Sequence, residues 1–137
     1  MNRNKRSITL DLKKPDGIRI VKELAGKCDI VLENFTPGTM DSLGIGYETL
    51  RAINPRIIYC SITGFGPDGP FSNRAGYDLA VSAFGGLMGI TGEPDGPPVK
   101  VGVAITDVAT GLSAQGAICA ALYAREMTGR CLLSTSD

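Results

Sequence analysis

Residues 7–33 read SITLDLKKPDGIRIVKELAGKCDIVLE, and this stretch decides which fold we expect. Ser7 to Leu12 alternates apolar and polar side chains, which is the period of a half-buried strand. Pro15 opens a segment whose apolar residues fall at helical spacing, and Gly26 ends it. The run Asp29 to Glu33 (DIVLE) is typical of a strand covered on both faces. Strand, helix and strand in this order predict a parallel crossover unit.

A second helix and a third strand follow. Tyr47 to Ile53 predicts a short helix, which Asn54 and Pro55 close. Arg56 to Thr63 (RIIYCSIT) is rich in β-branched and aromatic residues, as strands are. Residues 1–63 therefore predict an α/β fold, as part of a doubly wound, Rossmann-like parallel sheet.

Glycine, proline and small residues dominate the rest of the chain. Residues 64–76 (GFGPDGPFSNRAG) and 91–102 (TGEPDGPPVKVG) predict loops, with a helix from Tyr77 to Met88 between them. Val108 to Met127 predicts a long helix of Ala, Gly and Ser, whose small side chains permit close packing against another segment or chain. We therefore treat residues 64–137 as a second region of loops and helices.

The composition is that of one soluble globular domain. The chain has 137 residues, 43% of them apolar and 20% charged, and its 14 basic and 14 acidic side chains give a net charge of zero. This balance argues against a nucleic-acid partner, because no excess of positive charge is present to neutralise phosphates. The apolar stretches are too short for a membrane span, and the first residues lack the apolar core of a signal peptide. The chain starts shortly before one strand-like run and stops within another, so we expect a fragment of a longer protein.

The sequence contains no histidine. This excludes Ser/His/Asp triads, Cys/His dyads and histidine-ligated metals within the chain. The four cysteines, the first of which is Cys28, stand singly and form no CxxC pair, so we predict no metal site. Three of them lie inside apolar runs, which predicts buried, reduced thiols in a reducing compartment: Cys60, Cys119 and Cys131. Chemistry here would use carboxylates, thiols, lysines, hydroxyls or backbone amides.

Asp107 is the carboxylate best placed for chemistry. It lies where the 91–102 loop and a short apolar run give way to the small-residue helix, so we expect it near the N-terminus of that helix. Its simplest role is to cap the helix through free backbone amides, and spacing alone favours this role. Its apolar and small neighbours would, however, leave the carboxylate poorly solvated. A desolvated carboxylate beside backbone donors can act as a nucleophile.

Two further segments are candidate binding elements. Asn34 to Gly38 follows the second predicted strand, at the edge where open α/β sheets bind ligands, although NFTPG is also an ordinary turn sequence. Polar and basic residues bracket the first predicted strand at Asn4–Arg6 and Lys13–Lys14. They fit either a solvated edge or a phosphate site.

Five sequence blocks resemble, in order and spacing, the family III CoA-transferases of the CaiB/BaiF group. The blocks are NRNKRSITLDL (2–12), DIVLENFTPG (29–38) with LGIGYE (43–48), IIYCSITGFGPDGP (57–70), RAGYDLAVSAFGGLMGITG (74–92) and GVAITDVATG (102–111). The resemblance implies that Asp107 is the catalytic nucleophile. It also implies CoA-binding roles for the following residues: Leu10, Asp11, Leu12, Lys13, Asn34, Phe35 and Arg74.

The resemblance further implies the reaction and its participants. CoA passes from an acyl-CoA donor to a carboxylic acid through aspartyl anhydride and thioester intermediates, so the CoA thioester is a substrate and no metal or permanent cofactor takes part. The most similar members use succinyl-CoA and dicarboxylates such as glutarate or hydroxymethylglutarate. Family members are interlocked homodimers, and the similarity implies a mitochondrial location in a eukaryote and a cytoplasmic one otherwise. A later glycine loop and an opening strand and helix of the family fold are missing from the sequence.

Three other functions stay open at this point. The chain could be a non-catalytic fragment that only binds or joins a partner. It could be a 2-methylacyl-CoA racemase that uses Tyr77 or Asp78, although racemases of this family carry a histidine base at the position of Tyr77 and tyrosine is a poor base at neutral pH. A dinucleotide-binding reductase is disfavoured by the lack of a GxGxxG motif after a strand.

Overall fold

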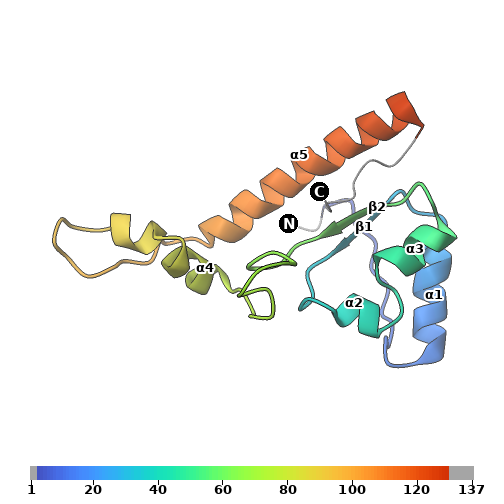
Figure 1. The fold of residues 1–137 in the computed structure, drawn as a ribbon, viewed down its shortest axis with the longest axis horizontal. Coiled ribbons are helices and arrows are strands. Elements are labelled where there is room, and N and C mark those ends of the chain that lie inside the picture. The colour runs from blue at the N-terminus through green and yellow to red at the C-terminus, as the bar shows by residue number, and fades with distance from the viewer. Residues whose placement is uncertain (1–2, 130–137) are drawn as a thin grey trace.

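The computed structural model describes residues 3–129. These residues form a small parallel sheet with helices on both faces and an arm that projects from it (Figure 1). The elements, in chain order, are α1 (Pro15–Ala25), β1 (Ile30–Glu33), α2 (Thr39–Ser42), α3 (Tyr47–Ile53), β2 (Ile58–Ser61), α4 (Asp78–Phe84), the 3₁₀ helix η1 (Leu87–Ile90) and α5 (Ile105–Thr128).

Strands β1 and β2 pair in parallel, with a register that runs from Ile30 opposite Ile58 to Glu33 opposite Ser61. Because parallel neighbours need a crossover connection, α2 and α3 connect them across one face of the sheet. Helices α1 and α3 contact each other on this face, and α5 contacts β2 on the other face (Figure 1). The α/β fold with a parallel sheet is therefore confirmed.

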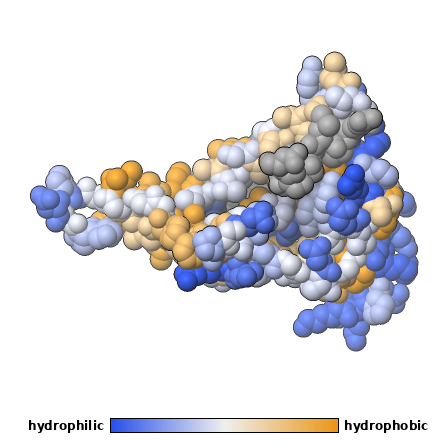
Figure 2. Space-filling view, in the orientation of Figure 1, coloured by the Kyte–Doolittle hydropathy of each residue, from blue (hydrophilic) through white to orange (hydrophobic). Residues whose placement is uncertain are grey.

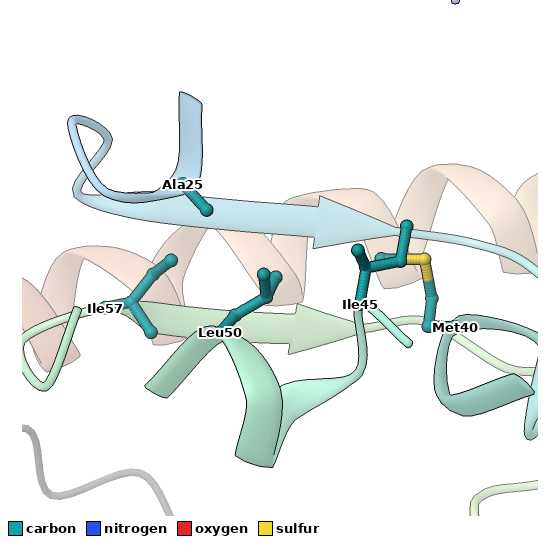
Figure 3. Packing of buried hydrophobic residues seen from close by; sticks show 5 residues of the cluster. All are labelled: Ala25, Met40, Ile45, Leu50 and Ile57. Carbon is teal, nitrogen blue, oxygen red and sulfur yellow. The ribbon is translucent and has the colours of Figure 1, made fainter. Parts of the chain in front are cut away.

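The core lies between the sheet and the helices α1, α2 and α3. Figure 3 shows its members, which come from helices α1, α2 and α3 and from the loops before α3 and before β2, and which are each at most 8% exposed: Ala25, Met40, Ile45, Leu50 and Ile57. Val31 and Tyr59 extend this cluster from the two strands. Because the cluster binds the strands to the helices that connect them, it fixes the carboxyl edge of the sheet, where the loops begin.

Helix α5 is held against the sheet by its C-terminal half. Ala121 is 7% exposed, and the guanidinium group of Arg125 donates hydrogen bonds to the Arg56 carbonyl (2.9 Å) and to the Asp29 carboxylate (2.8 Å). The helix ends at Gly129, whose φ of 70° is a left-handed conformation that glycine adopts without strain. Its start at Ile105 is three residues earlier than the predicted start at Val108.

The predicted strand at Ser7–Leu12 is wrong. These residues are not helical, but they belong to no strand within the described range, 3–129. An alternating pattern becomes a strand only when a neighbouring strand satisfies its backbone groups. Likewise, the expectation that the 29–33 strand is covered on both faces is wrong, because Leu32 is 57% exposed.

Two other expectations need correction. Helix α4 ends at Phe84 rather than Met88, because Gly85 terminates it and Gly86 follows in a left-handed conformation with φ 80°. The expected burial of the cysteines in apolar runs is also wrong for Cys119, which is exposed, whereas Cys60 is half-buried. Cys131 lies outside the described residues.

By length and composition alone, α5 could cross a membrane, with a mean hydropathy of 1.2. The short apolar runs of the sequence did not predict this. The helix carries Asp107 in its first turn, and Arg125 near its end is paired with Asp29. We interpret its apolar surface as a packing surface, because a helix that is apolar all round is also typical of the core of a larger protein.

Candidate active site

Asp107 is the third residue of α5, in its first turn, and its side chain is exposed. Neither the predicted capping position nor the expected poor solvation is therefore found. The N-cap residue is Ala104, whose side chain cannot accept a hydrogen bond. Apolar neighbours in the sequence did not bury the carboxylate, because a helix distributes successive residues over different faces.

The cap of α5 comes instead from Asp78, the first residue of α4. Its Oδ1 accepts hydrogen bonds from the backbone N–H of Thr106 (2.9 Å) and of Asp107 (3.3 Å), and also from the Thr106 hydroxyl group. These contacts join α4 to the start of α5 across 28 residues of sequence. They therefore fix the backbone that carries Asp107.

The surroundings of Asp78 favour its ionised form. The hydrogen bond from the Thr106 hydroxyl lowers the pKa of Asp78 most, and the amides of Asp107 and Thr106 and the charge of Lys100 lower it further, against an opposing effect of burial. From the sequence, Asp78 is expected only as an alternative racemase residue. The signal that it caps a helix from a distance is weak, because the sequence does not show which helix N-terminus lies near it.

The predicted CoA-binding segment Leu10–Lys13 forms a turn before α1. Asp11 organises it, since its Oδ1 accepts a hydrogen bond from the Lys13 N–H (2.9 Å) and its carbonyl accepts one from Lys14 (3.1 Å). The turn presses against Gly17, where an added Cβ would lie 2.1 Å from the Asp11 carbonyl oxygen. The exposed lysines of this turn stand at the positive end of α1, which suits an anionic group.

Asn34 and Phe35 follow β1 and are both exposed, Phe35 by 45%. The Phe35 N–H donates a hydrogen bond to the Glu33 carboxylate (2.8 Å), which tightens this turn. Next to it, at the carboxyl edge of both strands, is a pocket of about 320 Å³. Its lining comes from both strands and the segments that follow them: Glu33, Thr36, Pro37, Gly38, Met40, Asp41, Tyr47, Tyr59, Ser61, Thr63 and Pro67.

Arg74 lies in the loop between β2 and α4, where its guanidinium group sits 4.7 Å from the centre of the Phe71 ring. Phe65, Phe71 and Phe84 pack together, with ring centres 4.9 to 5.9 Å apart. The sequence does not predict this aromatic cluster, because its members are separated by loop residues that show no helical or strand periodicity. The cluster ties the loop, and with it Arg74, to α4.

The structure does not bring the predicted residues into one cluster, because the start of α1, which follows the Leu10–Lys13 turn, and the start of α5 lie far apart in Figure 1. The carboxyl ends of β1 and β2 point toward the side where α4 and the start of α5 lie (Figure 1). The backbone N–H of Asp107 donates a hydrogen bond to Asp78, and within residues 3–129 no hydrogen bond joins Asp107 to Asn34 or Phe35. The roles assigned to these residues and to Leu10–Lys13 and Arg74 stay predictions.

The described residues thus form a parallel α/β unit with turns at the carboxyl edge of its sheet and an aspartate in the first turn of a long helix. Comparison with known proteins identifies the family. The family model of CoA-transferase family III matches residues 1–132. The chain belongs to this family.

Similar proteins fall in the same family. The chain is 58% identical over 130 residues to the mouse protein named succinyl-CoA:glutarate CoA-transferase and 55% identical over 130 residues to the human protein of the same name. Each match covers 95% of this chain and 30% of the relative. A solved CaiB/BaiF family protein from Brucella suis superposes with a TM-score of 0.91 at 51% identity, over 94% of this chain and 34% of that protein. The chain thus spans about 30% of the length of the curated relatives it matches.

Proposed function

We propose that the protein containing this chain is a CoA-transferase that moves CoA from succinyl-CoA to a dicarboxylic acid such as glutarate or hydroxymethylglutarate. The observation that carries this proposal is the 58% identity to a relative named succinyl-CoA:glutarate CoA-transferase. A further relative from Agrobacterium fabrum, named succinate–glutarate CoA-transferase, is 52% identical over 121 residues. The CoA thioester is a substrate. The reaction needs no ATP because it breaks one CoA thioester and forms another of similar free energy.

The proposed chemistry is carried by Asp107. Its carboxylate attacks the thioester carbonyl of the donor, forming a mixed anhydride and releasing CoA thiolate. The thiolate attacks the aspartyl carbonyl, releasing the donor acid and leaving an aspartyl CoA thioester. The acceptor carboxylate then attacks this thioester, which forms a second anhydride and releases the CoA thiolate again, and the thiolate attacks the acyl carbon of the acceptor and displaces the Asp107 carboxylate. Acyl-CoA is released and the Asp107 carboxylate is restored.

The CoA moiety would be held by the turns already described. We assign the nucleotide to Leu10–Lys13, where the lysine charge and the α1 N-terminus suit phosphates. We assign the pantetheine arm to Asn34 and Phe35, and the wall of the CoA channel to Arg74. An amide side chain and an exposed aromatic ring match the peptide-like and apolar parts of that arm.

The exposure of Asp107 requires a cover that residues 3–129 do not supply. We propose that the complete protein is an interlocked homodimer and that its remaining segments cover this site and the apolar face of α5. Light scattering of the complete protein tests the dimer. By resemblance we propose a mitochondrial location for a eukaryotic protein and a cytoplasmic one otherwise.

The nucleophile is tested by Asp107→Asn in the complete protein. Because Asp107 is exposed and its backbone rather than its carboxylate is held by Asp78, the variant should fold normally. We expect succinyl-CoA:glutarate exchange to fall by more than about a thousandfold, as it does when a nucleophile is lost, while CoA still binds. The matched control is Asp95→Asn, an exposed carboxylate in the preceding loop whose φ of 62° asparagine tolerates.

A trapping experiment complements this variant. After incubation with succinyl-CoA and hydroxylamine, mass spectrometry should locate a hydroxamate on the peptide that holds Asp107 and on no other. An active protein in which that peptide stays unmodified, or an Asp107→Asn variant with full turnover, would show that another residue is the nucleophile.

A further inference from the structure

The first turn of α5 is capped by a residue of another helix. Helix α5 has 24 residues, and its N-cap, Ala104, offers no side-chain acceptor. The first four N–H groups of any helix lack partners within the helix. Asp78 supplies a partner for two of them, Thr106 and Asp107, through the single oxygen Oδ1.

Asp107 is the acidic residue of the first turn of α5, and its own backbone N–H is one of the two groups that Asp78 binds. The backbone that carries the Asp107 carboxylate is therefore tied directly to α4. A first turn whose N–H groups lack acceptors frays easily. Fraying of this turn would move the Asp107 carboxylate away from the place where it must meet the thioester.

We infer that Asp78 is a positioning residue, which holds the backbone N–H groups of Thr106 and Asp107 and so keeps the first turn of α5, with the Asp107 carboxylate, in place for the thioester. This inference rests on the proposed function. Thr106 takes part by binding the same oxygen through its hydroxyl group, which fixes the orientation of the Asp78 carboxylate. The lowered pKa of Asp78 agrees with this role, because the hydrogen bonds that Thr106 and Asp107 donate stabilise the ionised carboxylate.

The test compares Asp78→Ala with Asp78→Asn in the complete protein. Alanine removes the acceptor, so we expect kcat for CoA exchange to fall by about 10- to 100-fold, which is the range for a misplaced reacting group. Asparagine keeps an oxygen at the same place and should restore kcat to within about fivefold of the unchanged protein, since a neutral acceptor is weaker than a charged one. The dissociation constant of CoA should stay within about threefold in both variants, because the cap does not touch the predicted CoA-binding turns.

Two further measurements separate positioning from general destabilisation. The control Glu48→Gln changes another exposed acid in the first turn of a helix, α3, and should leave kcat unchanged. Amide hydrogen exchange at Thr106 and Asp107 should become faster in Asp78→Ala and stay slower in Asp78→Asn. This second readout does not depend on catalysis.

The outcomes distinguish the positioning role of Asp78 from the proposed CoA-transferase function. If Asp78→Ala keeps full kcat, or if both variants lose kcat, CoA binding and thermal stability together, the positioning role is refuted. Unchanged amide exchange at Thr106 and Asp107 in Asp78→Ala would also refute it. A complete protein with no CoA exchange at all, but with faster exchange at these amides in the alanine variant, overturns the proposed function and leaves the cap established.

Discussion

At the scale of single residues, Tyr59 lies near two acidic side chains at the edge of the sheet. It packs against Tyr47, with ring centres 5.8 Å apart, and lines the pocket together with Glu33 and Asp41. Burial raises the pKa of Tyr59 to about 12, and the charges of Glu33 and Asp41 and a hydrogen bond to Glu33 add to this effect. The pocket therefore favours a neutral phenol and resists a further negative charge.

This environment predicts a delayed titration. The chain has four tyrosines, and in the native state the near-ultraviolet absorbance of tyrosinate should show one of them ionising near pH 12. Because the folded pKa is raised, the stability that Tyr59 contributes is present below about pH 10 and is lost as pH rises toward 12. Tyr59→Phe should abolish the late step, with Tyr123→Phe, an exposed tyrosine of α5, as the control. A native protein whose tyrosines all ionise together near the ordinary pKa would contradict the account.

The sequence predicted the position of a residue where that position depends on neighbouring residues of the chain, and not where it depends on contacts with distant ones. Asp107 was correctly placed near the head of a helix, because helix propensity and the preceding loop are local signals. Its exposure and its relation to Asp78 could not be predicted, since they depend on how α4 approaches α5 across 28 residues. For the same reason Arg125 carried no signal. Its burial, at 5% exposure, comes from packing against β2 and from a pair with Asp29, 96 residues away.

At the scale of elements, the predictions succeeded where a stop signal stood in the sequence. Gly26 ends α1, Asn54 ends α3 and Gly129 ends α5, so these boundaries agree with the structure. The short helix α2 was missed because its four residues, Thr39–Ser42, are too few for periodicity to be visible. The division of the chain near residue 63 stays a prediction.

The contact between Gly17 and the 10–13 turn gives a prediction at this scale. In Gly17→Ala the new Cβ would lie 2.1 Å from the Asp11 carbonyl oxygen, so turn and helix must separate. Overpacking of this kind costs about 1–3 kcal/mol, whereas alanine gains only about 1 kcal/mol of helix propensity over glycine. We therefore expect lower thermal stability and, because Leu10–Lys13 moves, roughly tenfold weaker CoA binding by calorimetry in the complete protein.

Gly26→Ala is the matched control for this change. It lies at the other end of α1 with φ −63°, and its added Cβ would come no closer than 3.5 Å to any neighbour. This variant should bind CoA as the unchanged protein does. If Gly17→Ala binds CoA as well as the unchanged protein does, the 10–13 turn does not hold CoA.

At the scale of the whole molecule, the described chain is more open than a protein of its size normally is. Its accessible surface is 10141 Å², whereas a compact monomer of this mass exposes roughly 6,800 Å². The excess agrees with the elongated outline in Figure 1, where the arm formed by α4, η1 and the following loop projects from the α/β layers.

Part of this exposed surface is apolar, and helix α5 contributes to it. Ala121 and Arg125 face β2 and are buried, but the opposite face carries a second apolar stripe that is exposed: Val108, Leu112, Tyr123 and Met127. Figure 2 shows hydrophobic surface over the arm and along α5, and the exposed Phe84 and Ile90 belong to the arm. An exposed apolar surface that extends over several elements is typical of a region that packs against further protein.

The last prediction follows from this exposed stripe. The 137-residue chain produced alone should associate as its concentration rises and should bind a fluorescent apolar dye, because removal of the stripe from water is favourable. Leu112→Lys places a charge on the stripe and should shift the association, measured by light scattering, to several-fold higher concentration. Thr110→Lys adds the same charge at an exposed polar position on the opposite side of the same helix and should change it little. If the isolated chain stays monomeric without dye binding, or if both lysine variants act alike, the α5 stripe is not a packing surface and the cover proposed for Asp107 must come from elsewhere.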